Sequence, residues 1–227
     1  MKLGVSGAIT RLHHLFVRNG RADALSHHLA ELIPSDAASV LDIGCGDGLI
    51  DQAIKARRAD LTIEGIDLFP RPEALIPVRP FDGQVIPYAD KTFDAVMLVD
   101  VLHHAANAAS LLREATRVAR KYVVIKDVYG DGLVGPLILR FMDLVGNAGH
   151  SFAWTVDYWP RLRWQQTFSD LQLAVTENRD QLGLYPVPAS WLFERSYHFM
   201  ARLTLNQQAI PARGAQDPGY SAGRQTG

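Results

Sequence analysis

The chain has 227 residues, which is ample for one domain and short for two. It is 48% hydrophobic and 21% charged, an ordinary globular composition. Its net charge of -1 at pH 7 provides no basic field to attract phosphates, so nucleic acid is excluded as the expected partner.

Residues 1–35 are predicted to be helical up to Pro34, because apolar side chains recur there at helical spacing. The N-terminus shows no signal-peptide core, and no window of the chain is apolar enough to span a bilayer, so we expect a soluble, cytoplasmic protein. The pairs His13-His14 and His27-His28 are adjacent in sequence and diverge on a helix, which favours surface histidines over a metal site.

A strand, a tight turn and a helix are predicted from residue 40 onward, and the turn holds three glycines. The apolar residues of this helix recur on one face, and Asp51 is expected away from that face. Glycine tolerates positive φ and allows a ligand close to the backbone, and the N–H groups at a helix start suit an anionic group. A dinucleotide turn would require glycine at position 49, where the chain has Leu49. The pattern Asp42-x-Gly44-x-Gly46-x-Gly48 instead resembles the first motif of class I S-adenosylmethionine-dependent methyltransferases. Cys45, the single cysteine, lies inside it and excludes a disulfide framework or a paired metal-ligand set.

Residues 61–67 read as a second strand that ends in Asp67, roughly 20 residues beyond the turn, where doubly wound folds place an acceptor for ribose hydroxyls. Asp67 supports a nucleoside ligand, but it does not distinguish S-adenosylmethionine from a dinucleotide. The structural alternative is a solvated Asp at the end of the strand. Residues 69–80 hold four prolines and are expected to be irregular.

The resemblance becomes specific over residues 81–94. The methyltransferase group that includes ubiquinone-biosynthesis enzymes has an Asp, an apolar-Pro-aromatic step, an acid, and Phe-Asp opening the fourth strand. These places are filled here by Asp82, Ile86-Pro87-Tyr88, Asp90 and Phe93-Asp94. The resemblance implies that Asp82, with Gly83, binds the adenine amino group, for which a carboxylate is a suitable acceptor. A turn-forming Asp before Gly83 is the alternative.

Residues 95–99 are apolar on both faces, as in a central parallel strand, and ligands bind beyond the carboxyl ends of such strands. The segment from Asp100 to His104 is therefore expected near the cofactor. The resemblance implies that His104 shapes the site around the methionine part and only sometimes takes part in catalysis.

A helix from about residue 107 leads directly into a fifth strand that ends in Lys126-Asp127, without the Pro-Gly-Gly type of turn usual in the family. Lys126 and Asp127 suit either acceptor orientation or a plain salt bridge. Residues 128–168 are expected to hold a substrate-specific insertion after strand 5. The aromatic residues of this region suit an apolar or aromatic acceptor, although core packing explains them equally well.

The resemblance implies an α/β, doubly wound, Rossmann-like seven-stranded sheet whose last strand is antiparallel, with N-terminal helices. We expect one domain over residues 1–205 and a disordered tail over 206–227, which holds little to bury.

The implied reaction is methyl transfer from S-adenosylmethionine to a small-molecule acceptor at O, N or C, with S-adenosylhomocysteine as product and no metal. The residues implied to bind the cofactor are Asp42, Gly44, Cys45, Gly46, Gly48, Asp67, Leu68, Asp82, Gly83, Val99, Asp100 and His104. The candidates for a general base are His103, His104 and Asp127, together with Tyr129.

Two alternatives stay open. A nicotinamide-dependent oxidoreductase is disfavoured by Leu49 and by the lack of a Tyr-x-x-x-Lys pair on a helix, since Tyr122 and Lys126 fall within a strand. A non-catalytic binding module on the same fold is disfavoured by the acids at positions 67 and 82. The acceptor and the oligomeric state cannot be inferred from the sequence.

Overall fold

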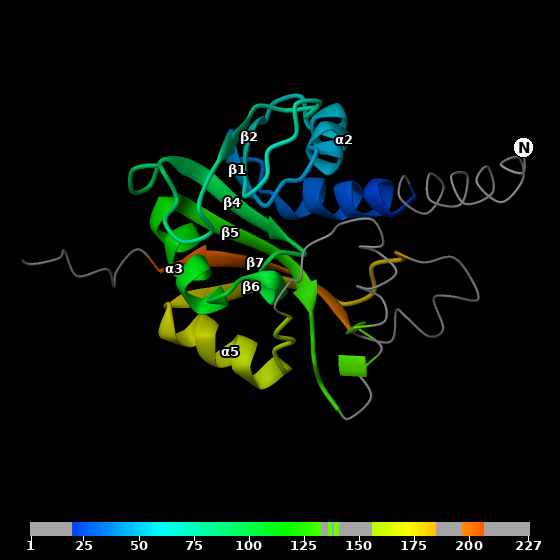
Figure 1. The fold of residues 1–227 in the computed structure, drawn as a ribbon, viewed down its shortest axis with the longest axis vertical. Coiled ribbons are helices and arrows are strands. Elements are labelled where there is room, and N and C mark those ends of the chain that lie inside the picture. The colour runs from blue at the N-terminus through cyan, green and yellow to red at the C-terminus, as the bar shows by residue number, and fades with distance from the viewer. Residues whose placement is uncertain (1–19, 133–135, 138, 141–155, 185–196, 207–227) are drawn as a thin grey trace, which may run out of the picture.

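Seven strands form one mixed sheet in the order β3-β2-β1-β4-β5-β7-β6. The computed structural model describes residues 20–132, 136–137, 139–140, 156–184 and 197–206 (Figure 1). The strands are β1 (Ser39–Ile43), β2 (Thr62–Asp67), β3 (Val78–Pro80), β4 (Phe93–Val99), β5 (Ala119–Val128), β6 (Leu173–Arg179) and β7 (His198–Leu205). The helices are α2 (Leu49–Arg57), α3 (Ala108–Val118), α5 (Arg161–Asp170), the short 3₁₀ helix η1 (Leu102–His104) and a helix over residues 20–32.

The strands β3, β2, β1, β4 and β5 run parallel, whereas β7 is antiparallel to both β5 and β6. In register, Val40 of β1 lies between Ile63 of β2 and Ala95 of β4. The predicted doubly wound, seven-stranded sheet with an antiparallel closing strand is therefore confirmed. The carboxyl ends of β1, β2, β4 and β5 meet at one edge of the sheet, where such folds bind ligands.

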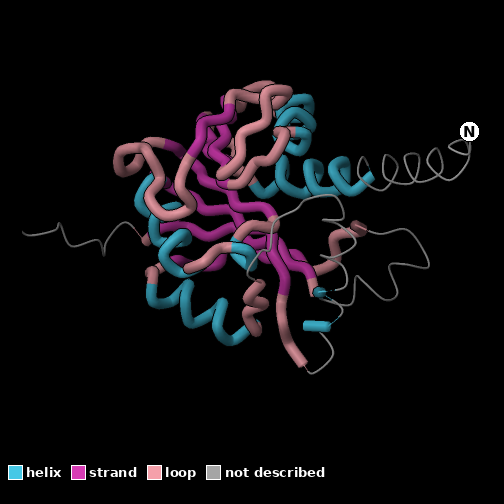
Figure 2. The backbone as a smooth tube through the Cα atoms, in the orientation of Figure 1, coloured by secondary structure: helices cyan, strands magenta, loops and turns pink. Residues whose placement is uncertain are grey.

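Helices cover both faces of the sheet (Figures 1 and 2). One face packs against the helix over residues 20–32 and α2, with Leu29 and Ile54 fully buried in its core. The other face packs against α3 and α5, where Leu112 and Trp164 are buried. Burial on both sides explains why β4 is a continuous apolar run rather than an alternating one. No described helix combines the length and apolar character needed to cross a bilayer.

Two local expectations were wrong. Residues 69–80 were expected to be irregular, but Val78–Pro80 form β3, an edge strand beside β2, where the missing N–H of a proline can be tolerated. Asp51 was expected on the outer face of its helix, but its side chain is fully buried beneath α2. Helical periodicity placed it wrongly because the residue lies in the first turn, over the sheet edge.

The connection between α3 and β5 is as short as the missing Pro-Gly-Gly turn predicted, since the helix ends at Val118 and the strand begins at Ala119. Of the aromatic residues after β5, Trp159, Trp164 and Phe168 are buried in the core, which favours their structural interpretation. Phe152 and Trp154, most of the expected insertion, residues 1–19 and the expected tail beyond residue 206 lie outside the described residues.

Asp94, at the start of β4, fastens the beginning of β1 to the sheet. Its carboxylate accepts hydrogen bonds from the backbone N–H groups of Ala38 and Ser39, both at 3.1 Å, and pairs with Arg120 at 2.6 Å. Burial alone would raise the pKa of Asp94, but these donors outweigh it and lower the pKa to about 2.

We expect acid to weaken this junction. Because the pKa of Asp94 is lower in the folded chain than in the unfolded one, its stabilisation is present above about pH 4 and is lost as the pH falls through about 2. The loss should amount to about 2 kcal/mol of unfolding free energy. Urea unfolding of the native chain and the Asp94→Asn variant at pH 6 and pH 2.5 measures it. The difference in unfolding free energy between the native chain and the variant should be smaller at pH 2.5 than at pH 6. A difference that does not change with pH would contradict this role of Asp94.

Candidate functional site

The glycine turn follows β1 at the carboxyl edge of the sheet. Gly44, Gly46 and Gly48 all have positive φ, at 75°, 61° and 75°. A Cβ at Gly44 would lie 2.5 Å from Val101, and one at Gly48 would lie 2.7 Å from Ile76, so packing requires glycine at both positions. A Cβ at Gly46 would meet no atom within 4 Å. The middle of the turn therefore borders open space, as a backbone that receives a ligand must.

Asp67 ends β2 directly beside this turn. Its Oδ2 accepts the N–H of Gly46 and its Oδ1 accepts the N–H of Phe69, each at 2.9 Å. Each carboxylate oxygen keeps a further acceptor position, since an ionised carboxylate offers about four. The structure thus brings the predicted acid to the predicted turn, with Leu68, 39% exposed, as its neighbour.

Asp82 and Gly83 form an exposed turn close to Leu68. A Cβ at Gly83 would lie 3.1 Å from Leu68 Cδ2, so the two segments are adjacent. Asp82 Oδ1 accepts the N–H groups of Gln84 at 2.8 Å and Val85 at 2.9 Å. These bonds lower the pKa of Asp82 and keep its carboxylate ionised, as a hydrogen-bond acceptor for a ligand must be.

Asp100 follows Val99 at the end of β4, with an unusual φ of 57°. Its carboxylate pairs with Lys126 of β5 and, at 2.6 Å, with Arg21 of the helix over residues 20–32. Burial would raise the pKa of Asp100, but the two cations hold it well below its usual range. Burial lowers the pKa of Lys126, although Asp100 opposes this.

His198 of β7 completes this buried group, with Nδ1 3.2 Å from Lys126 Nζ. Burial, and then the charge of Lys126, lower the pKa of His198 to about 2, so its imidazole is neutral and can accept from the ammonium. Of the two interpretations of Lys126, acceptor orientation and a salt bridge, its contact with Asp100 favours the salt bridge. Arg21 and His198 could not be predicted from the sequence, because both reach the site from elements far from the glycine turn and the motif over residues 81–94.

His103 and Asp127 form a separate buried pair. Asp127 Oδ1 lies 2.6 Å from His103 Nδ1, and Oδ2 accepts the N–H of Leu102 at 3.1 Å. The carboxylate thereby orients the imidazole and favours the tautomer whose Nδ1 carries a proton. His104 packs against His103 with ring centroids 4.0 Å apart, so the three predicted general-base candidates are brought together.

Tyr129, the fourth candidate, is held differently. Its ring stacks on Phe199 at 4.3 Å between centroids, and the guanidinium of Arg161 lies 3.8 Å from the ring centroid. Burial raises the pKa of Tyr129, so its phenol stays protonated at neutral pH and does not serve as a base there. These contacts account for it as a packing residue.

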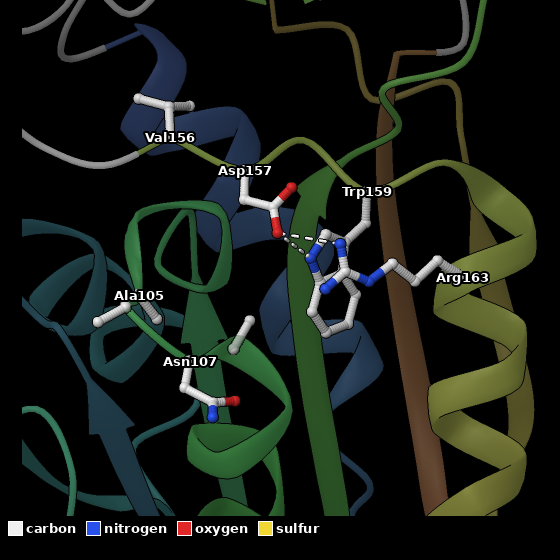
Figure 3. Close-up of a pocket in the computed structure, with 8 residues that line it drawn as sticks. Ala105, Asn107, Val156, Asp157, Trp159 and Arg163 are labelled. Carbon is white, nitrogen blue, oxygen red and sulfur yellow. Dashed lines mark hydrogen bonds and ion pairs between the residues drawn. The ribbon is translucent and has the colours of Figure 1, made fainter.

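A cavity of about 410 Å³ opens beside η1 and the first turn of α3 (Figure 3). It does not lie over the glycine turn. The N–H of Asp157, which lines it, donates to the carbonyl of His103 at 3.0 Å, so the cavity adjoins the His103–Asp127 pair. Asp157 also accepts from Trp159 Nε1 at 2.9 Å and Arg163 at 3.0 Å (Figure 3). The cavity is lined by Ala105, Ala106, Asn107, Ala108, Val156, Asp157, Trp159 and Arg163.

Within the described ranges, no three His, Cys, Asp or Glu side chains are placed to hold a metal ion. The Cys45 thiol is half-buried, and burial followed by the neighbouring acids raises its pKa, so it is an unreactive thiol at neutral pH.

Comparisons with known proteins match the central part of the chain. Residues 41–125 match the family model described as Methyltransferase domain. A 27-O-demethylrifamycin SV methyltransferase of Amycolatopsis mediterranei is 31% identical over 42% of this chain and 40% of its own length. A ubiquinone biosynthesis O-methyltransferase of Azorhizobium caulinodans is 30% identical over 50% of this chain and 49% of its own length. The chain therefore spans half or less of these curated relatives.

Solved structures share the fold at low sequence identity. A SAM-dependent methyltransferase from Aquifex aeolicus matches with a TM-score of 0.54 and 16% identity, over 80% of this chain and 89% of that one. The matched complex of a Haloferax volcanii methyltransferase activator with its methyltransferase gives a TM-score of 0.63 and 16% identity, over 84% of this chain and 92% of that one.

Proposed function

We propose that this chain, whose residues 41–125 match a methyltransferase domain, is a class I S-adenosylmethionine-dependent methyltransferase. We propose further that it transfers a methyl group from S-adenosylmethionine to a hydroxyl of a small apolar or aromatic molecule. The observation that carries the cofactor assignment is the open position at Gly46, whose N–H is bonded to Asp67. A backbone open to solvent and an acid at the end of the next strand are what a nucleoside with an amino-acid tail requires.

The described residues fit this cofactor from one end to the other. The turn of Gly44, Cys45 and Gly46 would hold the amino-acid end, with Asp42 and Gly48 supporting the turn. Asp67 and Leu68 would hold the ribose, because both oxygens of Asp67 keep acceptor capacity. The adenine would lie against the Leu68–Gly83 contact, with its amino group donating to Asp82. Val99, Asp100 and His104 would border the methionine side.

The cofactor supplies an electrophilic methyl group, so the chain's main task is to hold the acceptor in line with it and keep water away. We propose that His103 is the general base. With Nδ1 donating to Asp127, Nε2 is the nitrogen that would take the hydroxyl proton, as the oxygen bonds to the methyl carbon and the bond from that carbon to the sulfonium sulfur breaks. Asp127 stabilises the imidazolium that forms.

The choice of a hydroxyl acceptor rests on this pair and on the relatives. A neutral amine can attack the methyl carbon of a sulfonium without the help of a base. A hydroxyl, in contrast, becomes a much better nucleophile when its proton is removed. Two of the matched relatives are named for methyl transfer to oxygen. The cavity beside His103, with Trp159 in its wall, supports an apolar or aromatic acceptor.

A thermal-shift comparison tests the cofactor assignment. S-adenosylhomocysteine at 100 times its Kd should add about 2.7 kcal/mol of stability and raise the midpoint by several degrees, whereas NAD and NADP should leave it unchanged. Stabilisation by a nicotinamide nucleotide alone would indicate an oxidoreductase instead. If none of the three shifts the midpoint, a non-catalytic module becomes the better interpretation.

A further inference from the structure

Two buried acids, Asp42 and Asp51, lie on either side of the glycine turn in the sequence. Asp42 is the penultimate residue of β1 and lies on the face that α2 covers, and Asp51 lies in the first turn of α2. Asp42 is 3% exposed and Asp51 is fully buried. Each carboxyl group is close enough to the other to shift its pKa.

No donor from the described part of the chain reaches Asp42 Oδ1 or either carboxyl oxygen of Asp51. The charged groups that act on the pair are acidic as well: Asp67 acts on Asp42, and Asp47 acts on Asp51. Two neighbouring buried carboxylates without a counter-ion cannot both be ionised, because each penalises the charge of the other. The geometry therefore requires a proton between them.

We propose that Asp51 is a positioning residue that keeps a proton on the Asp42–Asp51 pair in the free protein, and that the pair releases this proton when the cationic amino group of the cofactor docks at the glycine turn. The inference rests on the proposed function and adds to it a dependence of cofactor affinity on pH. It assigns to Asp51 a role outside the recognised glycine motif.

The direction of the titration agrees with this geometry. Burial, and then the charge of Asp51, raise the pKa of Asp42 well above its usual range. Burial raises the pKa of Asp51 to about 7, although the neighbouring Asp42 side chain opposes the shift. An arriving ammonium group favours the ionised pair, so binding releases a proton near neutral pH. Affinity should fall about tenfold for each pH unit below the pKa of the free pair, and should level off above it.

Calorimetry with S-adenosylhomocysteine in two buffers of different ionisation enthalpy measures the proton count directly. At pH 6.5 the native chain should release between half a proton and one proton per ligand bound. The Asp51→Asn variant should release almost none, since the amide donates to Asp42 and lets it ionise without a second charge. Glu73→Gln, which removes an exposed acid of the same charge, should behave as the native chain does.

Equal proton release by the native chain and Asp51→Asn, or none by the native chain between pH 6 and 8, would overturn the inference while leaving the cofactor assignment intact. If S-adenosylhomocysteine does not bind, the proposed function fails, and unfolding in urea still tests the pair. A carboxyl group with a raised pKa loses its stabilising contribution as the pH rises through that pKa. The native chain should therefore weaken from pH 5 to pH 8 relative to Asp51→Asn, and parallel curves would show that the pair holds no proton.

Discussion

Replacing Gly46 with leucine should weaken binding of S-adenosylhomocysteine at least 100-fold, which corresponds to about 2.7 kcal/mol. The new side chain would enter the space within 4 Å of the Cβ position, which no described atom occupies. Folding should survive, because a Cβ at this position meets no atom within 4 Å and the left-handed backbone costs about 1–2 kcal/mol. Calorimetry and thermal unfolding of the same sample separate the two effects.

Gly183→Leu is the matched control. Gly183 has the same φ of 61° and also has no atom within 4 Å of its Cβ position, but it lies outside the glycine turn. Both variants should lose similar stability, and only Gly46→Leu should lose the ligand. Native affinity in Gly46→Leu would remove the observation on which the cofactor assignment depends.

The second large effect is expected at His103. The His103→Gln variant should lower kcat by about 100-fold to 10,000-fold, the usual contribution of a positioned general base. Its affinity for S-adenosylhomocysteine should stay within about threefold, because the imidazole is assigned to the acceptor hydroxyl and not to the cofactor. The rate of S-adenosylhomocysteine formation with an aromatic hydroxyl compound that supports turnover by the native chain measures kcat.

Asp127→Asn probes the same pair through its partner. An amide in place of the carboxylate no longer stabilises the imidazolium, so kcat should fall while His103 remains in place. This loss of kcat should persist at high pH. If the imidazole of His103 only packs, kcat should show no pH dependence from this residue. Native kcat in His103→Gln would exclude proton abstraction by this residue and favour an acceptor that needs no base.

The sheet and the arrangement of its ligand edge were predictable from sequence because they depend on local patterns. The run from Val40 to Ile43 and the glycines that follow specify a strand and a turn by composition alone. The acids at positions 67 and 82 were located by their distance from the turn and by the family motif. In the structure, Asp67 bonds to the glycine turn, and Gly83, the neighbour of Asp82, lies against Leu68.

The buried charges were not predictable in this way. Helical periodicity assigns Asp51 to the outer face of its helix, whereas the structure buries it. The spacing of apolar residues carries no information on which acidic side chains are buried near one another. Arg21 reaches Asp100 from the N-terminal helix, and His198 reaches Lys126 from the last strand, and both contacts depend on the order of strands rather than on neighbouring residues. The pairing of His103 with Asp127 likewise required β4 and β5 to be adjacent.

The most direct test of the account is a crystal structure of this chain with S-adenosylhomocysteine. We predict the amino-acid end of the ligand over Gly46, the ribose hydroxyls on Asp67, the adenine amino group on Asp82 and the sulfur on the side of His103. A ligand bound elsewhere on the molecule, or one whose ribose and adenine do not contact these two acids, would contradict it.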